Sequence, residues 1–415
     1  MIRNNMLARR NLGMALAALF VISQPASADF IKDSSGSLTT RNFYINRDFR
    51  QDNAPQSKAE EWAQGFILDL QSGYTQGVVG LGVDVFSELG VKLDSGAGRR
   101  GTGLLPYGPD SMEPVDNYSE AGLTAKMRFA KSELKVGTLR PTLPLAYYND
   151  MRLLPSTFSG GLLTSKDIED LTFTAGRLTK GNGRDSSSND DVGYAGQKSN
   201  HLDIVGGDYA LTKNLTLRYY HGELNDIYVQ QFGGLIHTWS LSKDISLRSD
   251  VRYFDSRDTG NAEAGRIDNR NLNGLFTLGI AAHKFSIGYQ RLTGDTAFPI
   301  IETGTPYVAN LVTFNAFTKL KETSWQARYV YDFAEMGVPG LTFMTRYVKG
   351  TGIHSRAITD GTEWERDTDI SYVIQSGTLK GLDVRWRNAT FRSGNGLTQA
   401  LDENRLIAAY TWKLW

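Results

Sequence analysis

The chain has 415 residues, and its 45 Lys and Arg side chains balance 45 Asp and Glu side chains. This balance gives no reason to expect nucleic acid or an acidic surface as a partner. The absence of cysteine excludes a disulfide framework and any thiolate metal site.

The first 28 residues have the pattern of an export signal. Basic residues, an apolar run and a small-residue cleavage site follow one another: Arg3, Arg9 and Arg10, then Leu12 to Ile22, then Ala26-Ser27-Ala28. The alternative is an N-terminal membrane anchor, but the apolar run is short for crossing a bilayer. We expect cleavage before Asp29, which leaves one domain, residues 29–415, with a net charge of −3.

Beyond the signal, apolar and polar positions alternate in stretches of strand length. No run of about 18 apolar residues remains, so no transmembrane helix is expected. Clear alternation occurs at residues 215–220, 245–253 and 325–333. In residues 381–392, one face carries apolar side chains and the other carries charged ones, including Asp383, Arg385 and Arg387. Such segments have the length of tilted strands in a membrane barrel.

Two kinds of break separate these stretches. Short polar breaks are expected near Glu88, Ser132, Glu169, Lys213, Lys243, His283, Gly337 and Thr378. Long loops are expected at 48–60, 94–118, 140–166, 179–200, 222–235, 255–272, 292–310, 349–366 and 392–403. Together they predict an all-β, transmembrane antiparallel barrel of 18 strands, or a neighbouring even number, with both termini at the short-turn end. The alternative is a soluble sandwich in which Trp239, Trp325 and Trp412 belong to the core rather than to the membrane boundary.

Several strings resemble the OprD family of outer-membrane carboxylate channels. They are residues 30–34 (FIKDS), 38–51 (LTTRNFYINRDFRQ), 59–66 (AEEWAQGF), 90–106 (GVKLDSGAGRRGTGLLP), 134–138 (LKVGT), 149–158 (NDMRLLPSTF) and 337–341 (GVPGL). The likeness extends from Asp29 to Trp415. The strings at 41–51 and 59–66 are more similar to the OccK branch, associated with cyclic and aromatic carboxylates, than to the OccD branch, associated with basic amino acids.

The resemblance implies a barrel narrowed by inward-folded loops, in which a row of basic side chains guides small carboxylates. Matching motifs assign Arg41, Arg47, Arg152, Arg385 and Arg387 to this row, and strand parity adds Arg128, Arg291 and Arg328. The loop around 149–158 resembles the third external loop, so Asn149, Asp150 and Arg152 are expected at the constriction. Residues 294–310 resemble the seventh, which places Asp295 and Tyr307 opposite.

The same likeness implies the surroundings of the protein. We expect a Gram-negative outer membrane, contact with its lipid and lipopolysaccharide, insertion by the barrel-assembly machinery, and a monomer or loose trimer. A guanidinium keeps its charge and presents a planar fork of donors to a carboxylate. For each arginine, the alternative is a structural pair with a nearby acid, such as Asp383 beside Arg385.

Other chemistries have little support. Gly96-x-Gly98-x-x-Gly101 matches a dinucleotide fingerprint in its letters, but three prolines and no helical pattern follow it. The five histidines lack the spacing of metal ligands, and no nucleophile elbow or triad can be grouped. We therefore predict a passive, non-enzymatic channel for small carboxylates that needs no cofactor and binds no metal. The alternatives are a channel for basic amino acids, a barrel enzyme resembling serine peptidases, and a soluble exported binding protein.

Overall fold

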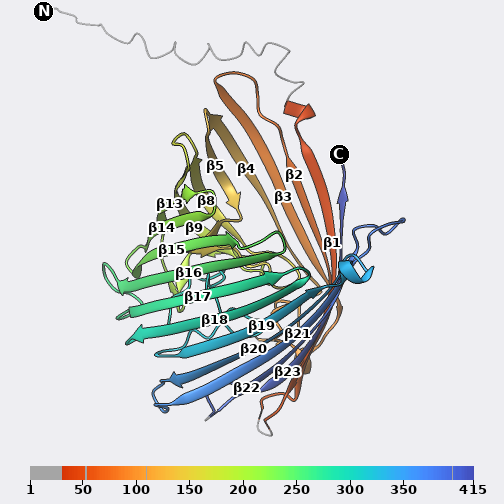
Figure 1. Cartoon of the computed structure of the whole chain (residues 1–415), viewed down its shortest axis with the longest axis vertical. Helices are drawn as coiled ribbons and strands as arrows, with labels where there is room; N and C mark the ends of the chain where they lie inside the picture. The colour runs from red at the N-terminus through yellow and green to blue at the C-terminus, as the bar shows by residue number, and fades with distance from the viewer. Residues whose placement is uncertain (1–29, 52–53, 109, 395) are drawn as a thin grey trace, which may run out of the picture.

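The computed structural model describes residues 30–51, 54–108, 110–394 and 396–415, and its strands form a closed barrel (Figure 1). Within the described residues, 18 antiparallel strands make the wall. They are β1 Ser35–Phe49, β2 Lys58–Gln71, β3 Val79–Asp94, β4 Asn117–Phe129, β5 Ser132–Leu139, β8 Thr157–Ser165, β9 Leu171–Asn182, β13 Leu202–Thr212, β14 Leu215–Leu224, β15 Tyr228–Ser240, β16 Ile245–Asp258, β17 Asp268–Ile280, β18 His283–Gly294, β19 Thr323–Asp332, β20 Leu341–Ile353, β21 Gly361–Val373, β22 Asp383–Ser393 and β23 Leu401–Lys413.

Short elements occupy the connections between the wall strands. They are β6 Thr142–Leu143, β7 Ala146–Tyr147, β10 Asn189–Asp191, β11 Gly193–Tyr194, β12 Gln197–Lys198, and the 3₁₀ turns η1 Ala97–Arg99 and η2 Phe333–Met336. No helix in the described part of the chain is long and apolar enough to cross a membrane. The expected signal segment and its cleavage site lie outside the described residues, so cleavage stays a prediction.

The first and last strands close the barrel. β1 pairs with β2 on one side and with β23 on the other, in a register that runs from Ser37 opposite Lys413 to Phe49 opposite Leu401. Closure leaves no wall strand with an unpaired edge, so the backbone polar groups of the wall are satisfied by neighbouring strands. The predicted fold class, strand number and shared end of the termini are confirmed.

The two faces of the wall differ in chemistry. Leu123, Tyr219 and Ile287 point outward, and each is about 60% exposed. The inward positions of β21 carry four acids in alternation, from Glu363 to Asp369, and all are buried. An apolar outer face and a polar lumen are the arrangement that a membrane barrel requires.

The predicted breaks agree with the structure except at three places. The expected loop 140–166 is too long, because Thr157–Ser165 form strand β8 and only residues 140–156 are loop. Glu88 lies inside β3, and the turn before this strand is at residues 72–78. The polar signal around Glu88 came from lumen-facing side chains of a long strand. Residues 222–235 are not a long loop, because Gly233 and Gly234 belong to β15 and only residues 225–227 connect it to β14.

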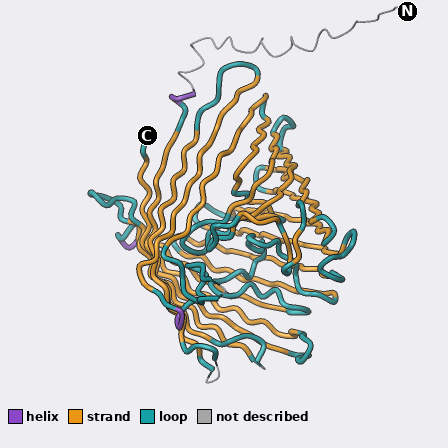
Figure 2. The backbone as a smooth tube through the Cα atoms, turned by 180° about the vertical axis from the view of Figure 1, so that it is seen from behind, coloured by secondary structure: helices purple, strands orange, loops and turns teal. Residues whose placement is uncertain are grey.

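Three connections matter for the lumen: loop L2 (residues 95–116), loop L3 (140–156) and loop L7 (295–322). Figure 2 shows loop segments, in teal, gathered inside the ring of strands. L2 and L3 are held by an apolar cluster that contains Leu104, Leu153 and the β1 residue Phe43. L7 is held against β16 by Phe298, whose ring meets Phe254 edge-on at 5.0 Å. Burial of such side chains, at roughly 1.5–3 kcal/mol each, fixes the loops to the wall.

Candidate functional site

Loops L3 and L7 meet inside the lumen and narrow it. Tyr148 and Gly304 form an antiparallel bridge, and the Thr305 N–H donates to the Tyr147 carbonyl over 2.7 Å. The Ser156 hydroxyl of L3 also donates to the Thr303 carbonyl of L7 over 2.7 Å. The two loops therefore behave as one partition across the barrel.

Arg41 holds L3 in place from β1. Its Nη1 donates to the carbonyls of Arg152 and Leu153, at 2.7 and 3.2 Å, and to Asp150 Oδ1 at 2.7 Å. Gly65 on β2 provides the space for this loop, since a Cβ there would lie 3.1 Å from the Leu153 side chain. Arg41 thus faces the lumen, and much of its donor capacity is used to position the constriction.

A cavity of about 280 Å³ lies between L3 and the wall formed by β22, β23 and β1. We call it the basic chamber, because arginines make up five of its eleven lining residues and acids only two. The arginines are Arg41, Arg152, Arg385, Arg387 and Arg405, and the acids are Asp150 and Asp383. Four of these arginines were predicted to form the basic row, while Arg405 was missed.

Within the basic chamber, Arg385 is freer than Arg387. Arg387 Nε donates to Asp369 Oδ2 on β21 over 2.6 Å. Arg385 makes only longer contacts, 3.7 Å from Nε to Asp369 Oδ1 and 3.6 Å from a terminal nitrogen to Asp383 Oδ2. Neither distance is that of a hydrogen bond. Asp369 is therefore the hydrogen-bonded partner of Arg387, while the expected Asp383 is as near to Arg385 as Asp369 is. The terminal nitrogens of Arg385 make no hydrogen bond to either acid, so they stay available for a solute.

Arg47 and Arg405 share a buried acid behind the chamber. Glu403 receives Arg47 Nε and Arg405 Nε, each over 2.5 Å, and its side chain is fully buried. Arg47 also reaches the Gly101 carbonyl of L2, and Arg405 the Thr313 carbonyl of L7. These two arginines therefore connect the wall to two inward loops.

The passage between L3 and L7 is lined by aromatic rings, and we call it the aromatic neck. Its cavity of about 470 Å³ contains Tyr147, Tyr148, Asp150, Met151, Arg252 and residues 305–308 and 311. The rings of Tyr147 and Tyr307 stack with centroids 6.0 Å apart. The Arg252 guanidinium lies 3.9 Å from the centre of the Tyr307 ring. Asp150 and Met151 line both this cavity and the basic chamber, so the two adjoin.

Two further arginines hold the neck, and neither was assigned to the basic row. Arg218 donates to the Tyr307 hydroxyl over 2.8 Å and to Asp208 over 2.8 Å. Arg252 pairs in the same way with Asp250. Both lie at inward positions of clearly alternating strands, a signal that could have identified them.

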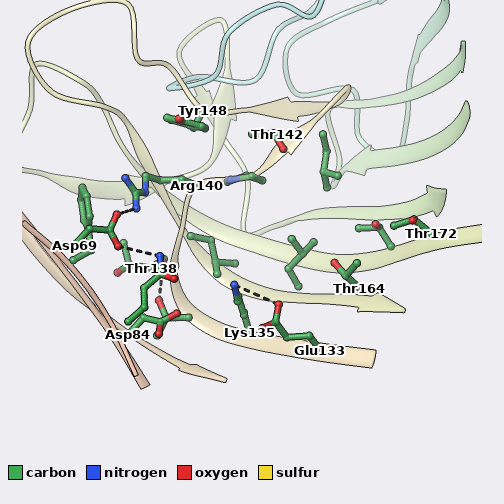
Figure 3. A pocket seen from close by; sticks show the side chains of 18 of the residues that line it. Asp69, Asp84, Glu133, Lys135, Thr138, Arg140, Thr142, Tyr148, Thr164 and Thr172 are labelled. Atoms are coloured by element: carbon green, nitrogen blue, oxygen red, sulfur yellow. Dashed lines mark hydrogen bonds and ion pairs between the residues drawn. The ribbon is translucent and has the colours of Figure 1, made fainter. Parts of the chain in front are cut away.

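A third and larger cavity, about 690 Å³, adjoins the neck at Tyr148 (Figure 3). It lies on the short-turn side of L3, against β2 to β5, β8, β9, β13 and β14. Six of its lining residues are threonines, so we call it the threonine chamber. They are Thr124, Thr138, Thr142, Thr164, Thr172 and Thr174.

The remaining predicted basic residues are dispersed. Arg128 lies at an inward position near the short-turn end, with its guanidinium 4.4 Å from the Tyr74 ring centre. Arg328 faces the lumen beside Ser286, at 3.3 Å. The inward assignment of Arg291 is wrong. On β18 the buried neighbours Gln290 and Leu292 face inward, which places the exposed Arg291 on the outer face.

Two of the expected constriction residues have other positions. Asp295 lies outside the neck, because it is 56% exposed and 3.3 Å from Arg266 of the neighbouring loop. Asn149 is part of L3, but its side-chain oxygen accepts from Arg184 over 3.2 Å and so braces the loop. Asp150 and Tyr307 do line the neck. No cluster of His, Cys, Asp or Glu able to hold a metal occurs among the described residues.

The family model of the outer membrane porin, OprD family, matches residues 28–414. The chain belongs to this family. Porin-like protein GalP from Pseudomonas putida is 38% identical over 96% of this chain and 97% of its own length. The crystal structure of Pseudomonas aeruginosa OccK9 (OpdG) has a TM-score of 0.91 at 44% identity, covering 93% of this chain and all of that one.

Pseudomonas aeruginosa OpdK, crystallised with vanillate, has a TM-score of 0.88 at 38% identity and covers the same share of both chains. The solved structures similar to this chain include OccK channels, which confirms the predicted branch. Membership of the family implies the outer membrane of a Gram-negative bacterium. In such barrels the short turns are periplasmic and the long loops external.

Proposed function

We propose that this porin is a passive channel for small carboxylates, with a preference for cyclic or aromatic ones. The observation that carries the proposal is the excess of arginine over acid in the basic chamber, directly beside the aromatic neck. An anion at about 4 Å from one guanidinium gains roughly 4 kcal/mol before desolvation at an effective dielectric of 20. Several such groups in succession attract a solute without trapping it.

The aromatic neck supports the cyclic part of the proposal. Tyrosine rings offer flat apolar faces to a ring-shaped solute. The Tyr307 hydroxyl is held by a hydrogen bond from Arg218. The similarity to OpdK, a channel crystallised with vanillate, agrees with this preference.

Uptake of labelled benzoate, glucuronate and arginine into liposomes tests the proposal. We expect wild-type protein to admit benzoate and glucuronate faster than arginine. The double variant Arg385→Ala with Arg387→Ala should lower carboxylate uptake about tenfold, since each guanidinium contributes a charge-assisted contact of roughly 1.5–3 kcal/mol that is partly offset by solvent. Arg291→Ala is the matched control, because its side chain lies on the outer face.

Two results would contradict the proposal. Unchanged carboxylate flux in the double variant would remove Arg385 and Arg387 from the path. Arginine uptake exceeding that of both carboxylates would instead favour the basic-amino-acid channel of the same family.

A further inference from the structure

The threonine chamber contains free hydroxyl groups. The Thr124 hydroxyl donates to the Thr138 carbonyl over 2.6 Å. Within the described part of the chain, the other five threonine hydroxyls that line the cavity have no hydrogen-bond partner. None of the five hydroxyls is completely sealed, and Thr174 is the most enclosed of these residues, at 3% exposed. A hydroxyl both donates and accepts, and therefore matches another hydroxyl whichever way that group is turned.

The charges of this chamber neutralise one another in pairs. Lys135 lies 3.3 Å from Glu133, and Arg218 lies 2.8 Å from Asp208. Arg140 is paired with Asp69, and Figure 3 shows this pair together with that of Lys135. The fourth acid of the lining, Asp84, is 2.5 Å from Lys126. With no excess of either sign, the chamber is suited to the neutral polar part of a solute rather than to its carboxylate.

Three of the free hydroxyls form one patch on adjacent strands. Thr164 on β8 is directly opposite Thr174 on β9, and Thr172 lies two residues away on the same face. Opposed side chains of neighbouring strands are roughly 5 Å apart at Cβ, a span that hydroxyl groups of a single six-membered ring can bridge. Tyr148 lines both this chamber and the neck, so a ring leaving the neck enters the chamber that contains the patch.

We propose that the threonine chamber is a periplasmic-side subsite for the hydroxyl groups of a ring carboxylate, so that polyhydroxylated rings are preferred over unsubstituted ones. This inference rests on the proposed carboxylate function and specifies its substrate class. Neutral hydrogen bonds suit an exit-side subsite, because each is weak enough to release the solute. A wall that is polar only because water fills the lumen would show no such preference.

The test removes the hydroxyls and keeps the side-chain shape. The variant carries Thr164→Val, Thr172→Val and Thr174→Val together. The control carries Thr277→Val and Thr342→Val, two inward threonines of β17 and β20 outside the chamber. The measurement is the concentration of glucuronate, and of cyclohexanecarboxylate, that halves benzoate uptake into liposomes. Competition reports binding inside the pore, which flux alone does not separate from release.

We expect wild type and control to bind glucuronate more tightly than cyclohexanecarboxylate. In the triple valine variant this preference should fall at least about fivefold. The loss of one net hydrogen bond weakens binding roughly two- to tenfold. The matching triple serine variant, which restores the hydroxyls, should regain most of it. The same comparison between 3,5-dihydroxybenzoate and benzoate extends the test to aromatic rings.

An unchanged preference in the valine variant would overturn the subsite, even while benzoate uptake and its dependence on Arg385 and Arg387 upheld the channel. Absence of carboxylate uptake in the wild type would overturn the proposed function itself. If the triple variant fails to assemble, Thr172→Val and Thr174→Val are measured as single variants. The inference is overturned if both variants prefer glucuronate over cyclohexanecarboxylate as strongly as the wild type does.

Discussion

The two sides of the lumen are built by the same strand alternation but offer different chemistry. The wall of β22, β23 and β1 carries more arginines than its acids can neutralise. The wall of the threonine chamber, made of β2 to β5, β8, β9, β13 and β14, carries charges in pairs, and β8 and β9 add free hydroxyls. Strand parity decides which side chains face the lumen. Their partners on neighbouring strands decide which of these side chains remain free to bind a solute. A solute with a charged end and a polar ring can therefore use both walls.

The largest expected effect comes from neutralising Glu403, the buried acid in the wall of β22, β23 and β1. Glu403→Gln leaves Arg47 and Arg405 buried without a countercharge, which typically costs about 3–5 kcal/mol. We expect a matching fall in the free energy of unfolding, measured by urea denaturation in detergent. Glu60→Gln removes an outer ion pair with Lys58 and keeps an amide oxygen for the Tyr44 hydroxyl, so it should cost less than about 1 kcal/mol. Equal losses in the two variants would show that Glu403 does not hold the wall.

A smaller effect should follow from removing an acid that competes with the solute for the arginines of the basic chamber. Asp369→Asn removes the acid nearest Arg387 and leaves both chamber arginines free to pair with a solute. Benzoate should then saturate uptake at a concentration about tenfold lower, a change of about 1.4 kcal/mol in binding. Asp203→Asn, whose partner Arg177 lies on the outer face, serves as the control. Saturation at the wild-type concentration would mean that Asp369 does not limit access to these arginines.

The smallest effect is expected on the threonine wall. Lys135→Ala leaves Glu133 without its basic partner and gives the chamber an excess negative charge. Uptake of glucuronate should fall about twofold, and the difference should shrink at high salt because exposed charges are screened. Lys213→Ala, in the exposed turn after β13, provides the comparison. A salt-independent loss would point to damage to the wall rather than to electrostatics.

Much of the architecture follows from short-range pattern. Alternation and breaks predicted the closed barrel of 18 strands, and parity placed Arg385 and Arg387 in the lumen. The acidic partner of Arg387 could not be predicted, because Asp369 comes opposite only once the register of β21 and β22 is fixed. The aromatic neck could not be predicted either, because Tyr147 and Tyr307 belong to loops that are far apart in the sequence. Arg291 was misplaced because the inward face of β18 is marked by its buried neighbours Gln290 and Leu292. The sequence alone does not show whether such side chains face the lumen or the lipid.

The junction of β1 and β23 has a consequence for biogenesis. The arginines of the basic chamber come from the first strand, the last two strands and L3, so the chamber is assembled across the seam where the two ends of the chain meet. Contacts this distant in sequence form late, because the entropy of bringing the ends together must be overcome first. An inserted but unclosed barrel would leak without discriminating between solutes. If the proposed carboxylate selectivity holds, it would therefore be a direct sign that the seam has closed.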